Sequence, residues 1–162
     1  MTAAAASSGV PQSLRDTLLR LVAAGFAGGV VDFIYPSVMA VSRGRPWTQP
    51  WESVASGWIG RAAAEGGPLV VGLGIVTHFG IAMAMAAAYI HVARRVPVVA
   101  ARPWATAPVY GLILYAIMYF GVLPLRFGNP WRWNGTLSAL DILAHVGVAL
   151  AIVAVAARRR PQ

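Results

Sequence analysis

One stretch of the chain, from Pro68 to His91, contains no aspartate, glutamate, lysine or arginine. In a helix that rises about 1.5 Å per residue, roughly 20 apolar residues match the ~30 Å hydrocarbon core of a bilayer. The length and apolarity of this stretch therefore predict a membrane-spanning helix. His78 lies near its middle, where a polar side chain needs either a partner or a function.

The composition of the whole chain agrees with residence in lipid. The 162 residues are 58% hydrophobic and 11% charged, with a mean hydropathy of +0.65, which lies outside the range of an ordinary soluble domain. All thirteen basic side chains are arginines, and five acids leave a net charge of +8. Because the arginines lie between the apolar runs, we interpret them as contacts to anionic lipid headgroups, not as a nucleic-acid site. The absence of cysteine excludes disulfides and thiol chemistry.

Apolar runs recur along the chain and predict an all-α, polytopic membrane protein, a bundle of four transmembrane helices with one short interfacial amphipathic helix. Residues 1–12 are expected to form a flexible tail, and residues 13–160 a single four-helix transmembrane domain. A signal peptide is the alternative for the first run, but no clean small-residue cleavage site closes it before Asp32. Gly25, Gly28 and Gly29 would let another helix approach closely. The expected spans are residues 14–41, 68–93, 104–123 and 136–157.

Between the first two spans, apolar residues recur at helical spacing from Trp51 to Ala62, which predicts a short amphipathic helix over about residues 50–65. Tryptophan is the residue type expected at a headgroup interface. We therefore expect this helix to lie flat on the membrane surface, although it could also form a lid over the bundle. The expected interfacial anchors are Trp47, Trp51, Trp58, Trp131 and Trp133.

The arginines also predict an orientation. The two chain termini and the 92–103 turn carry the larger set of arginines, packed into the shorter segments. The positive-inside rule then places both termini in the cytoplasm and the tryptophan-rich loops outside. The inner set is Arg15, Arg20, Arg94, Arg95, Arg102 and Arg158 to Arg160, and the outer set is Arg43, Arg45, Arg61, Arg126 and Arg132.

Polar residues inside the spans are the candidate site. Counting from the outer span ends places four of them about 8 to 10 residues deep, or ~12–15 Å, with Asp141 one turn further out. Asp141 and His145 share one helix face, so a histidine–carboxylate hydrogen bond between them is geometrically easy. Unpaired polar groups are costly in lipid, so we predict that these side chains point into the bundle and meet. The predicted cluster is Asp32, His78, Tyr115, Asp141 and His145.

Three functions could use this cluster. It could be structural, fixing helix packing in a scaffold, an accessory subunit of a larger membrane complex or a homo-oligomer. It could exchange protons near neutral pH, as in a proton-coupled transporter, a channel or a pH-responsive membrane protein. His78 and His145, at matching depth, could instead bind haem b or a metal ion. No phosphate loop, His-Glu-x-x-His pattern or nucleophile elbow points to catalysis, so we assign no catalytic residue and expect a non-enzymatic protein.

Several segments together resemble the YagU-like family of small bacterial inner-membrane proteins. They are GFAGGVVD, VASGWIGRAAAEGG, GLGIVTHFGIA with AAAYIHVARRVP, YAIMYFGVLPL and AHVGVALAIVAVAARR, which cover most of the chain from about Ala24 onward. Asp32, His78 and His145 fall on positions where that family has polar residues. The resemblance implies a four-span, multi-pass protein of the bacterial inner membrane, from a mostly uncharacterised family in which acid tolerance has been proposed for the namesake.

Overall fold

A computed structural model describes residues 12–128 and 130–157 of the chain, and these residues form helices joined by turns, with no β-strand among them. Four helical segments are long and apolar enough to cross a membrane, namely Leu14–Ser42, Pro68–Arg95, Pro103–Phe127 and Thr136–Ala156. The predicted all-α fold with four spans is confirmed. The expected tail and the arginine triplet lie outside the described residues.

The first two spans are single helices. Helix α1 comprises Gln12–Ser42 and continues through Pro36, and α3 comprises Pro68–Arg95. Between them α2 comprises Gln49–Ile59, followed by the 3₁₀ helix η1, Gly60–Glu65. The predicted amphipathic helix is therefore broken at Gly60. The backbone φ of 60° at Gly60 is left-handed and ends α2, and glycine adopts this conformation without the strain that a side chain would cause. A short helix, α4, comprises Pro97–Ala101 in the turn after α3.

The third span changes its winding along its length. Helix α5, Pro103–Ala116, passes into the π-helix η2, Ile117–Val122, and then into α6, Leu123–Phe127. A proline at position 124 lacks an N–H, and its ring would collide with the carbonyl of Phe120 in a regular helix. The wider π turn directly before Pro124 is a common accommodation of such a break. The last span is α7, Thr136–Ala156.

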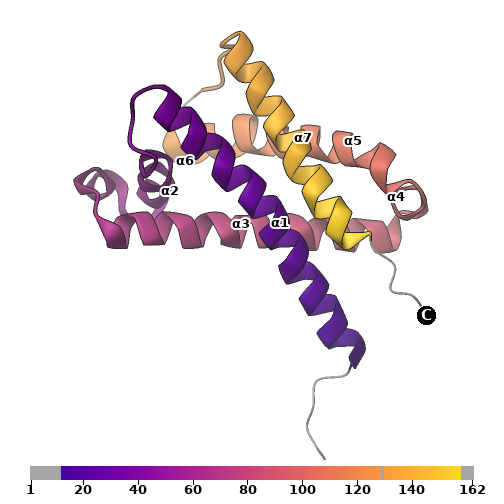
Figure 1. Cartoon of the computed structure of the whole chain (residues 1–162). Coiled ribbons are helices and arrows are strands. Elements are labelled where there is room, and N and C mark those ends of the chain that lie inside the picture. The colour runs from indigo at the N-terminus through magenta and orange to yellow at the C-terminus, as the bar shows by residue number, and fades with distance from the viewer. Residues whose placement is uncertain (1–11, 129, 158–162) are drawn as a thin grey trace, which may run out of the picture.

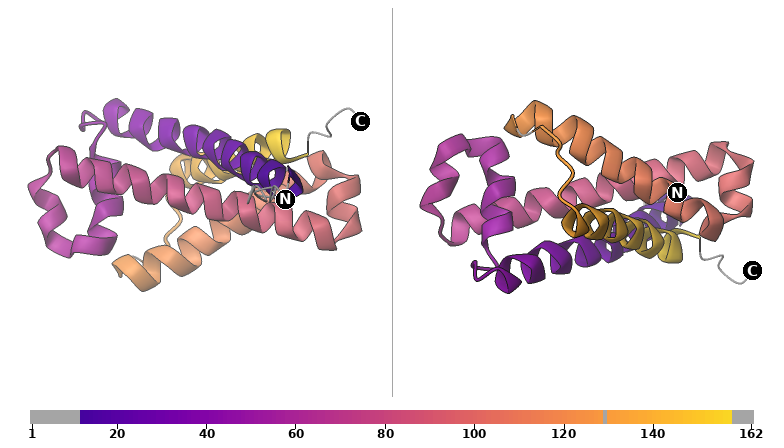
Figure 2. Two further views of the ribbon diagram at one scale, coloured as in Figure 1. Left: turned by 90° about the horizontal axis from the view of Figure 1, so that it is seen from below. Right: turned by 90° about the horizontal axis from the view of Figure 1, so that it is seen from above.

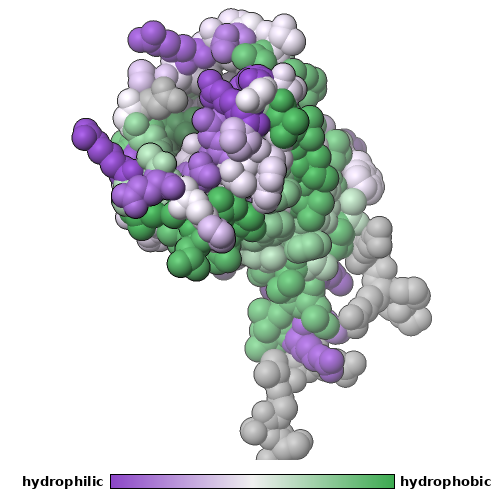
Figure 3. All heavy atoms as spheres, turned by 60° about the vertical axis from the view of Figure 1, so that its left-hand side comes forward, coloured by the Kyte–Doolittle hydropathy of each residue, from purple (hydrophilic) through white to green (hydrophobic). Residues whose placement is uncertain are grey.

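The helices pack in a chain of neighbours: α3 contacts α1, α1 contacts α7, and α7 contacts α5 (Figure 1). The start of α1, the end of α7 and α4 lie at one end of the molecule, which we call the α4 end. Helix α2, η1, α6 and residues 130–135 lie at the other, the α2 end, where α2 runs crosswise to α3 (Figure 2). Hydrophilic side chains gather at the ends, with a largely hydrophobic surface along the helices between them (Figure 3).

Small residues let the helices approach closely, as the glycine pattern of span one predicts. A Cβ built on Gly25 would lie 2.8 Å from the Cα of Met83 in α3, and one on Gly28 would lie 2.6 Å from a side-chain carbon of Ile152 in α7. At Gly74 of α3 a Cβ would lie 1.9 Å from the carbonyl oxygen of Trp51, so the backbone of α2 rests directly on α3. Close packing of this kind holds helices together in lipid, where the burial of apolar surface contributes little to helix association.

The two halves of the bundle differ in chemistry. The apolar core occupies the half next to the α4 end, where alanines and branched side chains of α3, α5 and α7 surround Ala24 of α1. The polar residues of the spans lie in the other half, next to the α2 end. The core residues are Ala24, Ala86, Tyr89, Ala107, Leu114, Val148, Ile152, Val153 and Ala156.

We predict that Gly74→Ala destabilises the protein by about 1–3 kcal/mol, because the added methyl group would collide with the Trp51 carbonyl. The free energy of unfolding, measured by titrating dodecyl sulfate into nonionic micelles, checks this. Gly72→Ala is the matched control, since its Cβ would meet no atom within 4 Å, and its stability should stay level or rise. Equal effects of the two substitutions would refute a tight contact between α2 and α3.

Candidate functional site

The predicted polar residues lie in the same half of the bundle but form two groups. Asp32 and His78 make one group, which we call the histidine–aspartate pair. The second group, around Asp141, is joined by two residues that the sequence reasoning left out, Tyr35 and Tyr119. We call it the tyrosine–aspartate group, and it comprises Tyr35, Tyr115, Tyr119, Asp141 and His145.

The imidazole of His78 links α3 to α1 at two points. Its Nε2 lies 3.0 Å from the carbonyl oxygen of Gly29, and its Nδ1 lies 3.7 Å from Oδ2 of Asp32. The carbonyl can only accept a hydrogen bond, so Nε2 carries a proton and Nδ1 is the nitrogen that faces the carboxylate. The His78 side chain is 9% exposed and that of Asp32 27%. The imidazole is thus largely removed from water, whereas the carboxylate is partly exposed.

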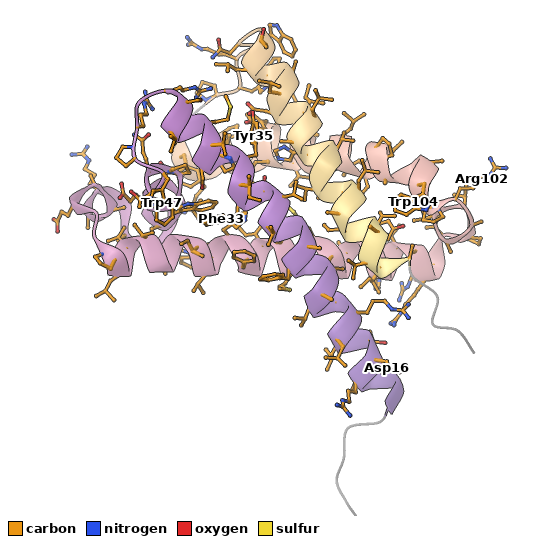
Figure 4. All side chains as sticks on the ribbon, viewed as in Figure 1. Asp16, Phe33, Tyr35, Trp47, Arg102 and Trp104 are labelled. Carbon is orange, nitrogen blue, oxygen red and sulfur yellow. The ribbon has the colours of Figure 1, made fainter. Side chains whose placement is uncertain are left out.

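Trp51 of α2 covers this pair. Its ring stacks on Phe33 of α1 at 4.4 Å and 7°, and lies 4.9 Å from the His78 ring. Trp51 is 1% exposed, and its indole Nε1 is buried with no acceptor among the described residues. In Figure 4 Phe33 lies on the side of α1 toward α2, near Trp47, whereas Tyr35 lies toward α7. Trp51 of α2 therefore covers the imidazole of His78 at the α2 end, while the Asp32 carboxylate stays partly exposed.

The tyrosine–aspartate group joins α1 to α7. The hydroxyl of Tyr35 donates a 2.5 Å hydrogen bond to Oδ1 of Asp141, and the hydroxyl of Tyr119 faces the same carboxylate as a donor. A hydrogen bond to an ionised carboxylate is stronger than one between neutral groups. Two phenols from two other helices thus compensate for the burial of Asp141 in α7.

His145 is part of the same group but does not bind the Asp141 carboxylate. Its Nδ1 lies 2.7 Å from the backbone carbonyl oxygen of Asp141, one turn back in α7. The predicted histidine–carboxylate bond is therefore wrong, because the nearer backbone oxygen takes the ring nitrogen. Tyr115 and Tyr119 pack on the imidazole edge to face, with centroids 5.5 and 5.9 Å away.

The expectation of one connected cluster is also wrong. Among the described residues no hydrogen bond or ion pair joins the two groups. Asp32 and Tyr35 lie on neighbouring turns of α1 but reach toward α3 and α7 respectively. The depth of these residues in a membrane stays a prediction, and the directions in which their side chains point separate the groups.

The predicted tryptophan anchors fall into two kinds. The prediction that Trp51 is an interfacial anchor is wrong, since its side chain is buried between α1 and α3 and cannot reach headgroups. Trp47, Trp58 and Trp133 are exposed, as surface anchors need to be, and Trp58 also donates to Thr77 Oγ1 at 2.9 Å. Trp131 is 36% exposed and donates to the Tyr115 hydroxyl at 2.8 Å, which ties the loop before α7 to α5.

A sequence signal exists for one of the missed tyrosines. Tyr119 follows Tyr115 by four residues, so it lies on nearly the same helix face as a predicted member. Tyr35 follows Asp32 by three residues but bonds to α7, whereas Asp32 faces α3, so this spacing does not predict its partner. Haem or metal binding through His78 and His145 stays a prediction. With Nε2 of His78 donating to the Gly29 carbonyl, the ring nitrogen left for such a group is Nδ1, which faces Asp32. In the described part of the chain no three His, Asp or Glu side chains gather in a metal-binding arrangement.

Four long apolar helices with exposed hydrophobic side chains are compatible with an integral, multi-pass membrane protein. Comparison of the chain with models of known protein families, with curated proteins and with solved structures finds no match. Function is therefore argued from the two polar groups and the surfaces around them.

We predict that Tyr35 and Asp141 are energetically coupled. In a double-mutant cycle of Tyr35→Phe, Asp141→Asn and the double variant, the coupling should stabilise the folded protein by about 1–2 kcal/mol, the range of hydrogen bonds between membrane helices. Unfolding in dodecyl sulfate gives the free energy of unfolding of each variant. A coupling of zero within error would mean that the bond adds nothing to helix association.

Proposed function

We propose that the chain is a four-span protein of the bacterial inner membrane that responds to pH through the histidine–aspartate pair, with α2 as its moving part. The observation that carries this proposal is the orientation of the His78 ring, held between the Gly29 carbonyl and the Asp32 carboxylate. This proposal includes membership of the YagU-like family, with whose suggested role in acid tolerance a pH response agrees.

The geometry supports a pair that holds one exchangeable proton. With Nε2 donating to Gly29, a neutral imidazole has only a lone pair on Nδ1. That lone pair would face the ionised carboxylate of Asp32, and two acceptors without a proton between them repel each other. One additional proton, on Nδ1 or on the carboxylate, removes the repulsion and leaves the pair with no net charge. Histidine is the side chain best suited to such an exchange near neutral pH.

Burial makes the protonation state matter for the structure. Trp51 shields the His78 ring from water, so loss of the proton would leave the pair with a carboxylate charge that water screens only in part. We therefore expect α2 to be held at lower pH and to loosen as the pH rises.

Helix α2 is suited to move. Its closed position buries the indole N–H of Trp51 without a hydrogen-bond acceptor, a cost of about 1–3 kcal/mol. This cost brings the closed and open positions of α2 closer in energy, so a change of one proton can shift the balance between them. Gly44 before α2 and Gly66 after η1, both at positive φ, flank the segment that would move.

The orientation of the protein in the membrane is part of the proposal. Arg15, Arg20, Arg94, Arg95 and Arg102 all belong to the α4 end, which supports cytoplasmic termini by the positive-inside rule. Anionic lipid headgroups are the partners of these side chains. Helix α2 and the histidine–aspartate pair would then sense the pH outside the inner membrane.

Thiol labelling tests the pH response, since the chain has no cysteine of its own. A cysteine at Ala55, which is fully buried in α2, should react with an impermeant maleimide faster as the external pH rises from about 5 to 8. Its rate is divided by that of a cysteine at exposed Ala62, which cancels the pH dependence of the thiol. In His78→Gln the ratio should no longer depend on pH.

Two results would contradict the proposal. A labelling ratio that stays constant with pH in the unsubstituted background would mean that the pair has no control over α2. Failure of Ala62→Cys to react in intact spheroplasts, with reaction only after lysis, would place the α2 end in the cytoplasm. Asp32→Asn serves as a second variant, because it removes the carboxylate while keeping the shape of the side chain.

A second candidate function is a scaffold or accessory subunit, either in a larger membrane complex or in a homo-oligomer. It is favoured by an apolar cleft of about 610 Å³ between α3 and α5, lined by side chains such as Met85, Ala88, Val109 and Ile113. A cleft between two spans can receive a transmembrane helix of a partner.

The scaffold candidate predicts that the protein purifies from mild detergent in a species larger than a monomer. Ala88→Trp, which fills the cleft, should release the monomer, because the bulky indole would occupy the place of the partner helix. Val76→Trp, on an exposed position of α3 outside the cleft, is the matched control. Native mass spectrometry measures the species, and a monomer in the unsubstituted protein would rule the candidate out.

A further inference from the structure

A polar cavity of about 430 Å³ opens at the α2 end, between the end of α1, the start of α2 and the start of α7. It is separate from the histidine–aspartate pair, since neither Asp32 nor His78 lines it. The Asp141 carboxylate and the phenols of Tyr35 and Tyr119 line it together with three arginines, Arg43, Arg45 and Arg132. Polar donors complete the lining, namely Gln49, Ser53, Asn134 and Ser138.

The three arginines give this cavity an excess of positive charge. None of them forms an ion pair with a carboxylate of a described residue, although Arg45 contacts the amide oxygen of Gln49 at 3.4 Å. Asp141 is the one acid in the lining, and its carboxylate already accepts from Tyr35. Three guanidinium groups against one occupied carboxylate leave the cavity two charges positive. Arginine matches oxyanions better than lysine does, because its planar fork can donate two parallel hydrogen bonds.

The first turn of α7 adds to the positive electrostatic potential of the cavity. Leu137 and Ser138 of that turn line the cavity, and the helix begins without a side-chain cap and without an acidic residue in its first turn. The partial positive charge of a helix N-terminus therefore faces the same space as the arginines. Two independent features, free guanidinium groups and an uncapped helix start, favour the same kind of ligand.

We propose that this cavity binds a phosphate group, carried either by a lipid headgroup or by a small soluble phosphate. Arg43, from the loop after α1, and Arg132, from the loop before α7, would hold the phosphate oxygens. The Ser138 hydroxyl offers a further donor, whereas the hydroxyls of Tyr35 and Tyr119 already donate to Asp141. The volume leaves room for the atoms to which a phosphate ester is attached.

Asp141 opposes this binding, because its ionised carboxylate repels an anion in the cavity. The groups that face Asp141 are Tyr35 from α1, Tyr119 from η2 and the three arginines of the loops. On its own helix, His145 bonds to the backbone oxygen of Asp141 and not to its carboxylate.

Calorimetric titration of the full chain with inorganic phosphate, in lipid-free nonionic micelles at constant ionic strength, tests a soluble ligand. Native mass spectrometry of the chain from micelles doped with phosphatidylglycerol tests a headgroup ligand. The double variant Arg43→Gln, Arg132→Gln should weaken binding at least about tenfold, since each lost charged hydrogen bond contributes substantially. Asp141→Asn should strengthen binding at neutral pH by roughly tenfold, because it removes a like charge several ångströms away.

The control is Arg61→Gln with Arg102→Gln, which changes the net charge equally but lies outside the cavity. Saturable phosphate binding that the cavity variant alone weakens supports a soluble ligand. A retained lipid that the cavity variant alone loses supports a headgroup. Absence of both, or an equal loss in the control variant, overturns the proposal. The pH dependence of Ala55→Cys labelling does not involve these arginines, so the two proposals fail separately.

Discussion

Close contact between helix backbones at glycine is the constraint on which the rest of this structure depends. In lipid the helices gain little from burying apolar surface, so they must approach far enough for dispersion forces and hydrogen bonds to hold them. Gly29 shows how packing and chemistry are linked. A Cβ there would lie 2.7 Å from the ring of Phe79, and the carbonyl of the same residue receives Nε2 of His78. A side chain at this position would collide with the Phe79 ring unless that ring shifts, and would disturb the packing that brings the Gly29 carbonyl to His78.

The bundle is divided into an apolar half, which packs the helices together, and a polar half, which contains the titratable side chains. Next to the α4 end, Ile152 and Val153 are fully buried and anchor α7 against α1 and α5. Next to the α2 end, the same helices are joined by directional bonds to carboxylates. Apolar packing persists over a wide pH range, whereas bonds to titratable groups do not. Under the proposed pH response, the apolar half would keep the four helices together while the polar half changes.

Much of the fold was predictable, because charge-free runs of sufficient length have few alternatives to spanning a bilayer. Helix rise converts residue number into height, so the sequence could place Asp32, His78, Asp141 and His145 in the same half of the bundle, while their depth in a membrane stays a prediction. Their grouping was not predictable, because side chains at one height can point in any direction around an axis. The burial of Trp51 was also hidden, since interfacial and core tryptophans occur in similar amphipathic patterns. Only the backbone contact with Gly74 distinguishes the two environments.

The π turn from Ile117 to Val122 determines which side chains of α6 contact α2. A π turn amounts to one extra residue in a helix, and each residue rotates an α-helix by about 100°. Every side chain after η2 is therefore turned through roughly that angle compared with an uninterrupted helix. Phe127 packs beside Gly57, where a Cβ would lie 3.4 Å from its ring. Shortening the third span by one residue would rotate this ring away, so the register of η2 determines which face of α6 meets α2.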